Sequence, residues 1–333
     1  MTGAVYYAGK EGLLSDIFGS EVTVSAGHIH VNGQTYPVVD DVIVLDLARA
    51  PEAVRRRVAG GDPAATSDAA FAPDIQSTFG AEWQTFPDIL PEHSTEFGQY
   101  FDVAPRDLYA GKRVCDLGCG IGRWSHFLKD VARELVLVDF SDAIFVARRN
   151  LQSAGNAVFF LGDITRLPFR SDFADFILCL GVLHHLPLDC LTETRRLGRF
   201  APTLLIYLYS KLDGGPLFWR TIFPIVDVLR RLVSGVESTA FRTAFTWAAT
   251  MLLYLPLVGL GALVRPLGLS HYVPLYQFYH GKSTERLRQD AYDRFFTSIE
   301  QRVSRAEILA LHDAFARIEV SSGLPKWHFL CRR

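Results

Sequence analysis

The sequence predicts an α/β fold built on a doubly wound, largely parallel sheet. Between residues 75 and 210, short apolar runs alternate with helical stretches, as in parallel strands that are buried on both faces. A glycine-rich turn follows the first of these runs and precedes a helix. The alternation resumes after residue 290 with one helix and two closing strands.

Residues 1–48 are expected to form a small β module, because short extended runs are separated there by turn residues. Asn32-Gly33 is a strong hairpin signal within it. Residues 49–74 are rich in Ala, Pro, Gly, Asp and Arg and show little hydrophobic periodicity, so we expect a linker. The arginine run at 55–57 is expected to be a solvated face.

The core is expected in two parts, 75–210 and 290–333. A capping box at Ser304 and Glu307 predicts where the helix of the second part begins. Five strands in the first part and two in the second predict a seven-stranded sheet, with strands at 113–117, 134–139, 158–161, 173–180, 203–209, 317–321 and 327–331.

Residues 211–289 are expected to be a helical insert before strand six. Its 243–264 segment has no charge and, as a helix, would extend about 33 Å, enough to cross a membrane. A single crossing is disfavoured, because both ends of the insert must return to one sheet. We expect a helical cap over the functional site, and the alternative is an interfacial element that contacts a membrane through 214–265.

The sharpest chemical signal is the run from Asp116 to Gly122, with glycines at 118, 120 and 122, at the end of a buried strand. Strand two ends at Asp139, where an acid can accept hydrogen bonds from both ribose hydroxyls of an adenosine. Asp163 follows strand three, where a carboxylate can hold an adenine amino group. A dinucleotide fingerprint would need a glycine at position 123, which is Arg.

With these residues the sequence resembles the class I S-adenosylmethionine-dependent methyltransferases of the small-molecule branch. The resemblance implies a Rossmann-like, seven-stranded sheet and S-adenosylmethionine as cofactor. It implies that the acid–glycine loop holds the methionine moiety, the strand-two acid the ribose and the strand-three acid the adenine. The cofactor-binding residues implied in this way are Asp116, Gly118, Cys119, Gly120, Gly122, Asp139, Phe140, Asp163, Ile164 and Gly181.

Four further segments carry or limit the resemblance. Residues 180–185, Leu-Gly-Val-Leu-His-His, match the segment that ends strand four beside the methyl donor. Residues 79–83 and 290–294 look like flanking elements of a bacterial subgroup with a helical insert. Residues 36–39 look like the end of a zinc-ribbon-like module, but the ribbon's cysteines are absent, so no metal is expected.

Histidines at the end of strand four are the candidates for catalysis. A histidine side chain ordinarily titrates near neutral pH, so His185 or His184 could act as a general base toward a hydroxyl acceptor; the alternative is that they only orient loops. Cys115 and Cys119 are expected to pack as small apolar residues. Residues that could line the acceptor, or else only pack the insert, are Tyr276, Tyr279, Asp290, Tyr292 and Asp293. Asp293 could equally form a structural ion pair with Arg294.

The composition limits which functions the chain can have. A net charge of −2, from 34 basic and 36 acidic residues, argues against a nucleic-acid partner. Five scattered cysteines and no signal-like N-terminus predict a cytoplasmic protein, with peripheral contact at the inner membrane surface as an alternative. The sequence therefore predicts an enzyme that methylates a small or lipid-like acceptor at oxygen. The alternatives are a non-catalytic donor-binding scaffold and, less favoured, a nicotinamide-dependent oxidoreductase.

Overall fold

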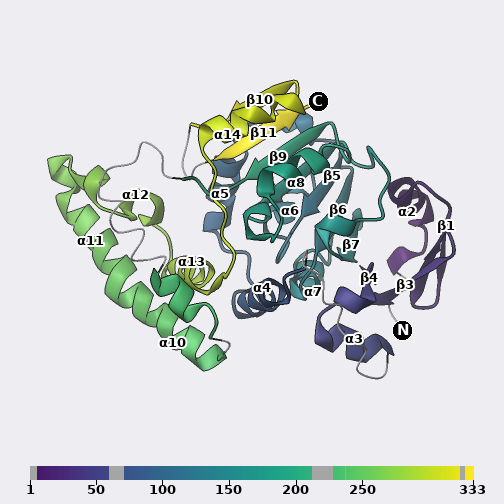
Figure 1. Cartoon of the computed structure of the whole chain (residues 1–333), viewed down its shortest axis with the longest axis horizontal. Coiled ribbons are helices and arrows are strands. Elements are labelled where there is room, and N and C mark those ends of the chain that lie inside the picture. The colour runs from purple at the N-terminus through teal and green to yellow at the C-terminus, as the bar shows by residue number, and fades with distance from the viewer. Residues whose placement is uncertain (1–5, 60–70, 212–227, 237, 323–326) are drawn as a thin grey trace. The chain divides into compact units, whose positions relative to one another are not determined.

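A computed structural model describes residues 6–59, 71–211, 228–236, 238–322 and 327–333. The chain divides into two compact units, one of residues 1–211 with 299–333 and one of residues 212–298. The second unit ends at 298, beyond the boundary at 290 that the sequence suggests. The predicted β module over 1–48 belongs to the first unit (Figure 1).

Within the described residues, eleven strands form one sheet in the order β1-β2-β3-β4-β7-β6-β5-β8-β9-β11-β10. The seven from β7 to β10 are the predicted strands, and the central five pair in parallel. This confirms the Rossmann-like α/β class. The strands are β1 Val22–Ser25, β2 His28–Val31, β3 Gln34–Val39, β4 Val42–Val44, β5 Arg113–Leu117, β6 Glu134–Asp139, β7 Ala157–Leu161, β8 Phe176–Leu180, β9 Thr203–Tyr207, β10 Arg317–Val320 and β11 His328–Arg332.

The N-terminal strands extend the main sheet. β4 pairs in parallel with β7, Ile43 opposite Phe160, and β3 pairs with β4 in the antiparallel sense. Asn32 and Gly33 both have positive φ, at 48° and 76°, as the predicted two-residue hairpin between β2 and β3 requires. The sheet therefore has four more strands than the seven that the sequence predicts for the core.

The central strands are buried on both faces, as their unbroken apolar sequence predicts. Alternate residues of β6 pack into two separate cores: Val136 and Val138 into one, Leu135 and Leu137 into the other. Figure 1 shows helices on both sides of these strands. The helices of eight or more residues in this unit are α2 Glu11–Phe18, α3 Glu52–Ala59, α4 Pro73–Thr85, α5 Glu92–Tyr100, α7 Ala143–Asn150 and α8 Cys190–Leu197.

Shorter helical segments complete the first unit. The capping box of Ser304 and Glu307 forms as predicted, and the helix it opens continues as a 3-10 turn. The segments are η1 Leu47–Arg49, η2 Arg106–Leu108, α6 Arg123–Leu128, η3 Ile164–Arg166, η4 Leu183–His185, α14 Arg305–Leu309 and η8 Ala310–Asp313.

The predicted linker over 49–74 is wrong in part, because residues 52–59 form α3. Pro51 precedes the helix, Glu52 forms an ion pair with Arg56 one turn later, and Val54 is buried. Val54 and the partly buried Val58, one turn later, pack against the core, and two apolar residues are too few for a clear periodic pattern. Residues 60–70 lie outside the described part of the chain.

The second unit is helical in its described part. A continuous helical segment covers Thr239–Leu267, and only 17% of its most apolar window is buried. By length and composition it is the one described helix that could cross a membrane. The elements are α10 Thr239–Ala249, a π-helical turn η5 Thr250–Tyr254, α11 Leu255–Val264, η6 Arg265–Leu267, η7 Ser270–Tyr272, α12 Tyr276–Tyr279 and α13 Thr284–Phe296. Residues 212–227, the start of the predicted insert, are outside the described residues.

Candidate functional site

Three acids meet at the carboxyl edge of the sheet because β7, β6 and β5 are neighbours. Asp116 lies near the end of β5, Asp139 ends β6 and Asp163 follows β7. The strand order reverses between β5 and β8, and the crevice at such a reversal is where open α/β sheets bind ligands.

The glycines of the loop after β5 allow close packing. Gly118, Gly120 and Gly122 all have positive φ, which strains other L-residues. A Cβ on Gly118 would lie 2.3 Å from a methyl carbon of Val182. A Cβ on Gly120 would lie 3.1 Å from the indole of Trp83. The glycines therefore let the loop backbone pack directly against the side chains of Val182 and Trp83 beside the strand ends.

Asp139 is buried and holds this loop. Its Oδ2 accepts a hydrogen bond from the Gly120 amide at 2.8 Å. Its Oδ1 accepts from the Ser141 amide at 2.9 Å and from the Ser141 hydroxyl at 2.7 Å. Burial raises the pKa of Asp139, although these donors favour the ionised form. A carboxylate can accept about four hydrogen bonds, so acceptor capacity remains for a ligand.

Asp116 is the second fully buried carboxyl, and it accepts a hydrogen bond from the Ser125 hydroxyl at 2.7 Å. Burial raises its pKa to about 7, opposed by the Ser125 hydrogen bond. Cys115 and Cys119 beside it are buried free thiols, and burial raises both pKa values well above the ordinary range. Thiols of this kind are unreactive, as expected of residues that only pack.

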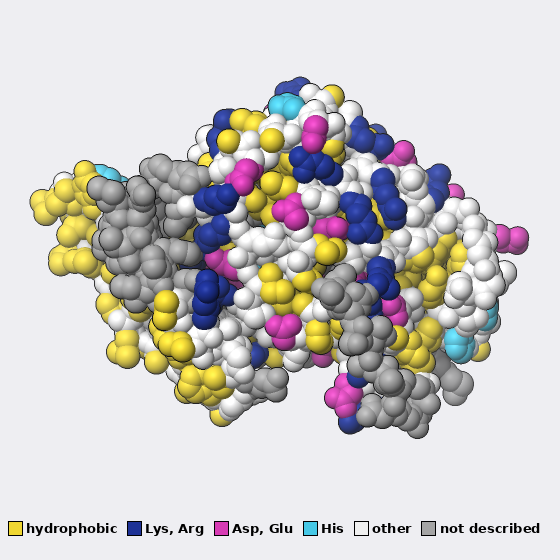
Figure 2. Space-filling view, viewed as in Figure 1, with side chains coloured by type: hydrophobic (Ala, Val, Ile, Leu, Met, Phe, Trp, Pro, Cys, Tyr) yellow, Lys and Arg dark blue, Asp and Glu magenta, His cyan; other side chains and the backbone are white. Residues whose placement is uncertain are grey.

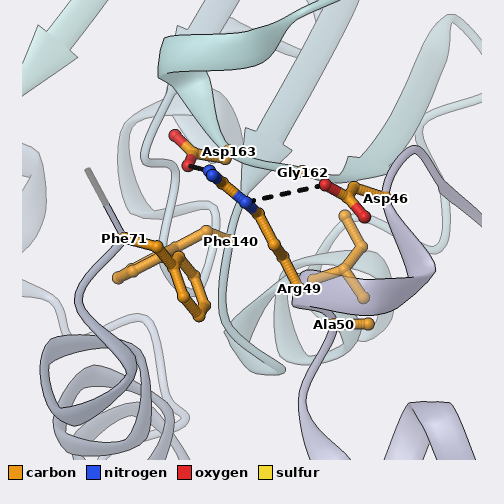
Figure 3. Close-up of a pocket in the computed structure, with 8 residues that line it drawn as sticks. Asp46, Arg49, Ala50, Phe71, Phe140, Gly162 and Asp163 are labelled. Carbon is orange, nitrogen blue, oxygen red and sulfur yellow. Dashed lines mark hydrogen bonds and ion pairs between the residues drawn. The ribbon is translucent and has the colours of Figure 1, made fainter. Parts of the chain in front are cut away.

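Asp163 is paired with a residue that the sequence did not indicate. Arg49, from η1, forms an ion pair with it at 2.5 Å, and both side chains are buried. Figure 3 shows Arg49 reaching between Asp46 and Asp163, with Phe71 and Phe140 alongside. The only sequence signal was an arginine soon after a strand, within the stretch expected to be a linker.

Helix α4, which includes the predicted flanking segment 79–83, contributes several contacts here. Trp83 lies against the glycine loop, and the ring of Phe79 lies 5.1 Å from that of His185. The Gln76 side chain donates hydrogen bonds to the carbonyls of Arg49 and Phe140. Helix α4 thus connects the loop, the acids and the predicted catalytic histidines.

The two histidines differ in their surroundings. His185 Nδ1 lies 2.8 Å from the Ile299 carbonyl, which assigns the proton to Nδ1 and the lone pair to Nε2. His184 is buried and stacked on Tyr209, 4.0 Å between ring centroids. Burial lowers the pKa of His184 well below its ordinary value, so it stays neutral. Of the two, His185 is the one whose tautomer the structure fixes.

Comparison with known proteins identifies this region. Residues 114–199 match the family model of a methyltransferase domain, and the match includes the glycine loop and all three acids. The chain contains a class I methyltransferase domain. This confirms the predicted family and enzyme class. It also confirms S-adenosylmethionine, the methyl donor of class I domains, as the cofactor.

Two solved structures are similar to parts of the chain. Phosphoethanolamine N-methyltransferase 1 of Haemonchus contortus is 18% identical over 43% of this chain and 34% of its own length, with a TM-score of 0.36. An S-adenosylmethionine-dependent methyltransferase of Aquifex aeolicus is 20% identical over 41% of this chain and 77% of its own, with a TM-score of 0.34. The chain thus spans about a third of the Haemonchus protein. No curated protein matches it.

The residues of the methyltransferase domain fit this donor. The loop has no side chain at its three positive-φ glycines, and the Asp139 carboxylate lies beside it, bonded to the Gly120 amide. Asp116 and Asp139 would hold the methionine and ribose moieties, and Asp163 the adenine, with Cys119, Phe140, Ile164 and Gly181 beside them. These individual roles stay predictions. Among the described residues, no group of His, Cys, Asp and Glu could hold a metal ion.

The predicted acceptor residues lie in the second unit and are engaged there. Tyr279 donates a hydrogen bond to Asp290, which also pairs with Arg294 and Arg286. Burial disfavours ionisation of Asp290, but these cations hold its pKa below the ordinary value. Tyr292 accepts a hydrogen bond from Arg242 at 3.0 Å.

Two further residues of this set, Tyr276 and Asp293, also have contacts inside the second unit. Tyr276 is buried, and its ring occupies the space beside Gly261. Thr297 donates to the backbone carbonyl of Asp293. The ion pair suggested between Asp293 and Arg294 is replaced by Asp290–Arg294, since neighbours in a helix do not face each other. Contact of any of these residues with an acceptor stays a prediction.

Proposed function

We propose that the chain transfers the methyl group of S-adenosylmethionine to an oxygen atom of a small or lipid-like acceptor. The observation that supports this most is the pair of buried carboxyls, Asp116 and Asp139, around a positive-φ glycine loop at the point where the strand order reverses. Methyltransferase neighbours that bind small molecules are consistent with this acceptor class.

The chain acts mainly by holding the methyl donor and the acceptor in position. S-adenosylmethionine supplies a methyl group that is already activated by a sulfonium charge. Asp139 is fixed by Gly120 and Ser141, so its carboxylate needs little reordering when it binds a ligand. Holding two reactants in line can lower a barrier by about 7–11 kcal/mol.

His185 is the proposed general base. The Ile299 carbonyl holds Nδ1–H, so Nε2 has the lone pair that would take a hydroxyl proton. The Phe79 ring packs against the imidazole and limits its rotation. A base of this kind is typically worth about 10²–10⁴-fold in rate.

Exposed apolar side chains of the second unit support the proposal of an apolar acceptor and of a peripheral membrane contact. Large apolar side chains are exposed along its long helix, among them Leu252 at 79% and Leu263 at 75%. Trp247 and Tyr272 are also exposed, and such rings favour the membrane interface. Figure 2 shows apolar side chains gathered over α10 and α11. A cytoplasmic location at the inner membrane surface is part of this proposal, and a cap over the site stays a prediction.

Ligand titration tests the proposed function. Calorimetry of the whole chain with S-adenosylmethionine, S-adenosylhomocysteine and NAD is expected to show binding of the first two. Asp139→Ala should weaken that binding, because the ribose hydroxyls lose their acceptor. Preferential binding of NAD would overturn the proposal. Donor binding without methylation of any acceptor in a cell extract would favour a non-catalytic scaffold.

A further inference from the structure

Arg49, in the η1 turn that follows the N-terminal strands, brings a positive charge to the predicted adenine acid. We propose that Arg49 is a positioning residue of the donor site, which holds the Asp163 carboxylate ready to accept the adenine amino group. The inference rests on the proposed function, because Asp163 has this role only in a donor-binding protein. It assigns a part in donor recognition to the strands and the turn that precede the methyltransferase domain.

The hydrogen bonds of Asp163 define what it can still bind. Its Oδ1 accepts from the Thr165 amide at 2.8 Å and from the Thr165 hydroxyl at 2.7 Å. Its Oδ2 accepts from Arg49 Nη1. Each carboxylate oxygen has two acceptor positions, so Oδ2 can accept one more hydrogen bond. An amino group can donate that bond, and a carbonyl oxygen cannot.

The position of Arg49 is closely determined. Asp46 begins η1 by accepting a hydrogen bond from the Ala48 amide, and its other oxygen lies 3.7 Å from Arg49 Nε. The guanidinium lies 5.3 Å from the centre of the Phe71 ring. Arg49 is therefore packed in one place and does not swing freely.

The same segment is attached to the residue predicted to flank the adenine. Gln76 Nε2 donates to the Arg49 carbonyl at 2.8 Å and to the Phe140 carbonyl at 2.5 Å. One side chain of α4 therefore fixes both η1 and the turn after β6. Any shift of η1 would move the partner of Asp163 and disturb Phe140 together.

Stability alone is a poor explanation for this ion pair. Its side chains are only 3% and 7% exposed, so both charges have lost most of their hydration. Apolar residues of similar volume often stabilise a fold as well as such a pair does. A buried pair whose acid borders the ligand edge of the sheet is better explained by recognition. The arginine fixes the orientation of the carboxylate through this contact.

The experiment compares two ligands that differ at one group. Wild type and Arg49→Met are titrated by calorimetry with S-adenosylhomocysteine and with its inosine analogue, whose base has a carbonyl oxygen in place of the amino group. Arg49→Met is expected to weaken the binding of S-adenosylhomocysteine about ten-fold or more, the usual range for the loss of a charged hydrogen bond. The analogue should bind weakly to both proteins, so discrimination between the two ligands shrinks. Arg49→Lys should restore part of it.

Controls separate this role from folding and from the proposed function. Arg56→Met removes an exposed arginine of α3 and should leave both affinities unchanged. In an Asp163→Asn background, Arg49→Met should have little further effect on binding. Equal affinity of Arg49→Met and wild type, or an equal loss for both ligands, would overturn the proposal. If Arg49→Met unfolds, Arg49→Lys and Asp163→Asn give the same comparison. A wild type that binds neither ligand would overturn the proposed function instead.

Discussion

At the scale of single residues, the buried carboxyl of Asp116 makes donor binding depend on pH. Burial raises its pKa to about 7, so it is partly protonated at neutral pH. A donor with a cationic amino group favours the ionised form, so binding releases a proton. We expect the affinity for S-adenosylhomocysteine to fall as pH decreases from 8 to 6, by up to about ten-fold per unit below the pKa. Calorimetry across this range measures it.

Asp116→Asn is the control for that dependence, since an amide does not titrate. The variant should bind more weakly at pH 8 and show a flat profile. The raised pKa of Asp116 also makes the stability of the fold depend on pH. The folded state binds a proton more tightly than the unfolded chain, so Asp116 stabilises less as pH rises through 4 to 7. An affinity that does not change with pH would contradict the raised pKa.

His185 gives a second prediction for one residue. His185→Gln removes the base but keeps a side chain of similar size, so the turnover rate should fall about 10²–10⁴-fold while donor affinity changes little. Transfer of a labelled methyl group to a lipid extract measures the rate. His312→Gln, at an exposed histidine of η8, is the matched control. Unchanged turnover would show that His185 only orients the loop.

At the scale of elements, the glycine loop is expected to tolerate no side chain at position 118. Gly118→Ala combines a positive φ with a clash against Val182, and should lower the free energy of unfolding by about 1–3 kcal/mol. Donor affinity should fall as well. Adding Val182→Ala should recover part of both, because it relieves the clash but not the φ. Thermal unfolding and calorimetry measure the two effects.

The matched control for the loop is Gly155→Ala, since nothing lies within 4 Å of a Cβ there. It should leave stability and binding close to wild type. Equal behaviour of Gly118→Ala and Gly155→Ala would mean that the loop does not need its close contacts.

The central strands and the N-terminal turn differ in how far the sequence predicts them. β5 and β6 have the predicted limits, because unbroken apolar runs define a buried parallel strand. α3 and η1 leave no such signal, since few of their side chains are buried and their one buried charge is an arginine. A buried Arg49 cannot be recognised without its partner, Asp163, 114 residues away.

At the scale of the whole molecule, membrane contact is the property that one assay can decide. The full chain is expected to float with phosphatidylcholine vesicles that contain phosphatidylglycerol. Leu252→Glu with Leu263→Glu should abolish flotation, because two charges would enter the exposed apolar surface. Gln152→Glu with Ser153→Glu adds the same charge at exposed positions of the first unit and should still float. A wild type that stays with the soluble fraction would contradict the proposed contact.

By itself the sequence determined the order of the α/β core, the glycine loop and the three acids at the strand ends. These features are local, since each is a short run of residue types whose backbone preferences or burial are visible in the run itself. Only the tertiary structure decided that β4 joins β7 and that Arg49 pairs with Asp163. It also decided that the predicted acceptor residues are engaged within the second unit. Such pairings join residues far apart in the chain, and they follow from how the chain folds.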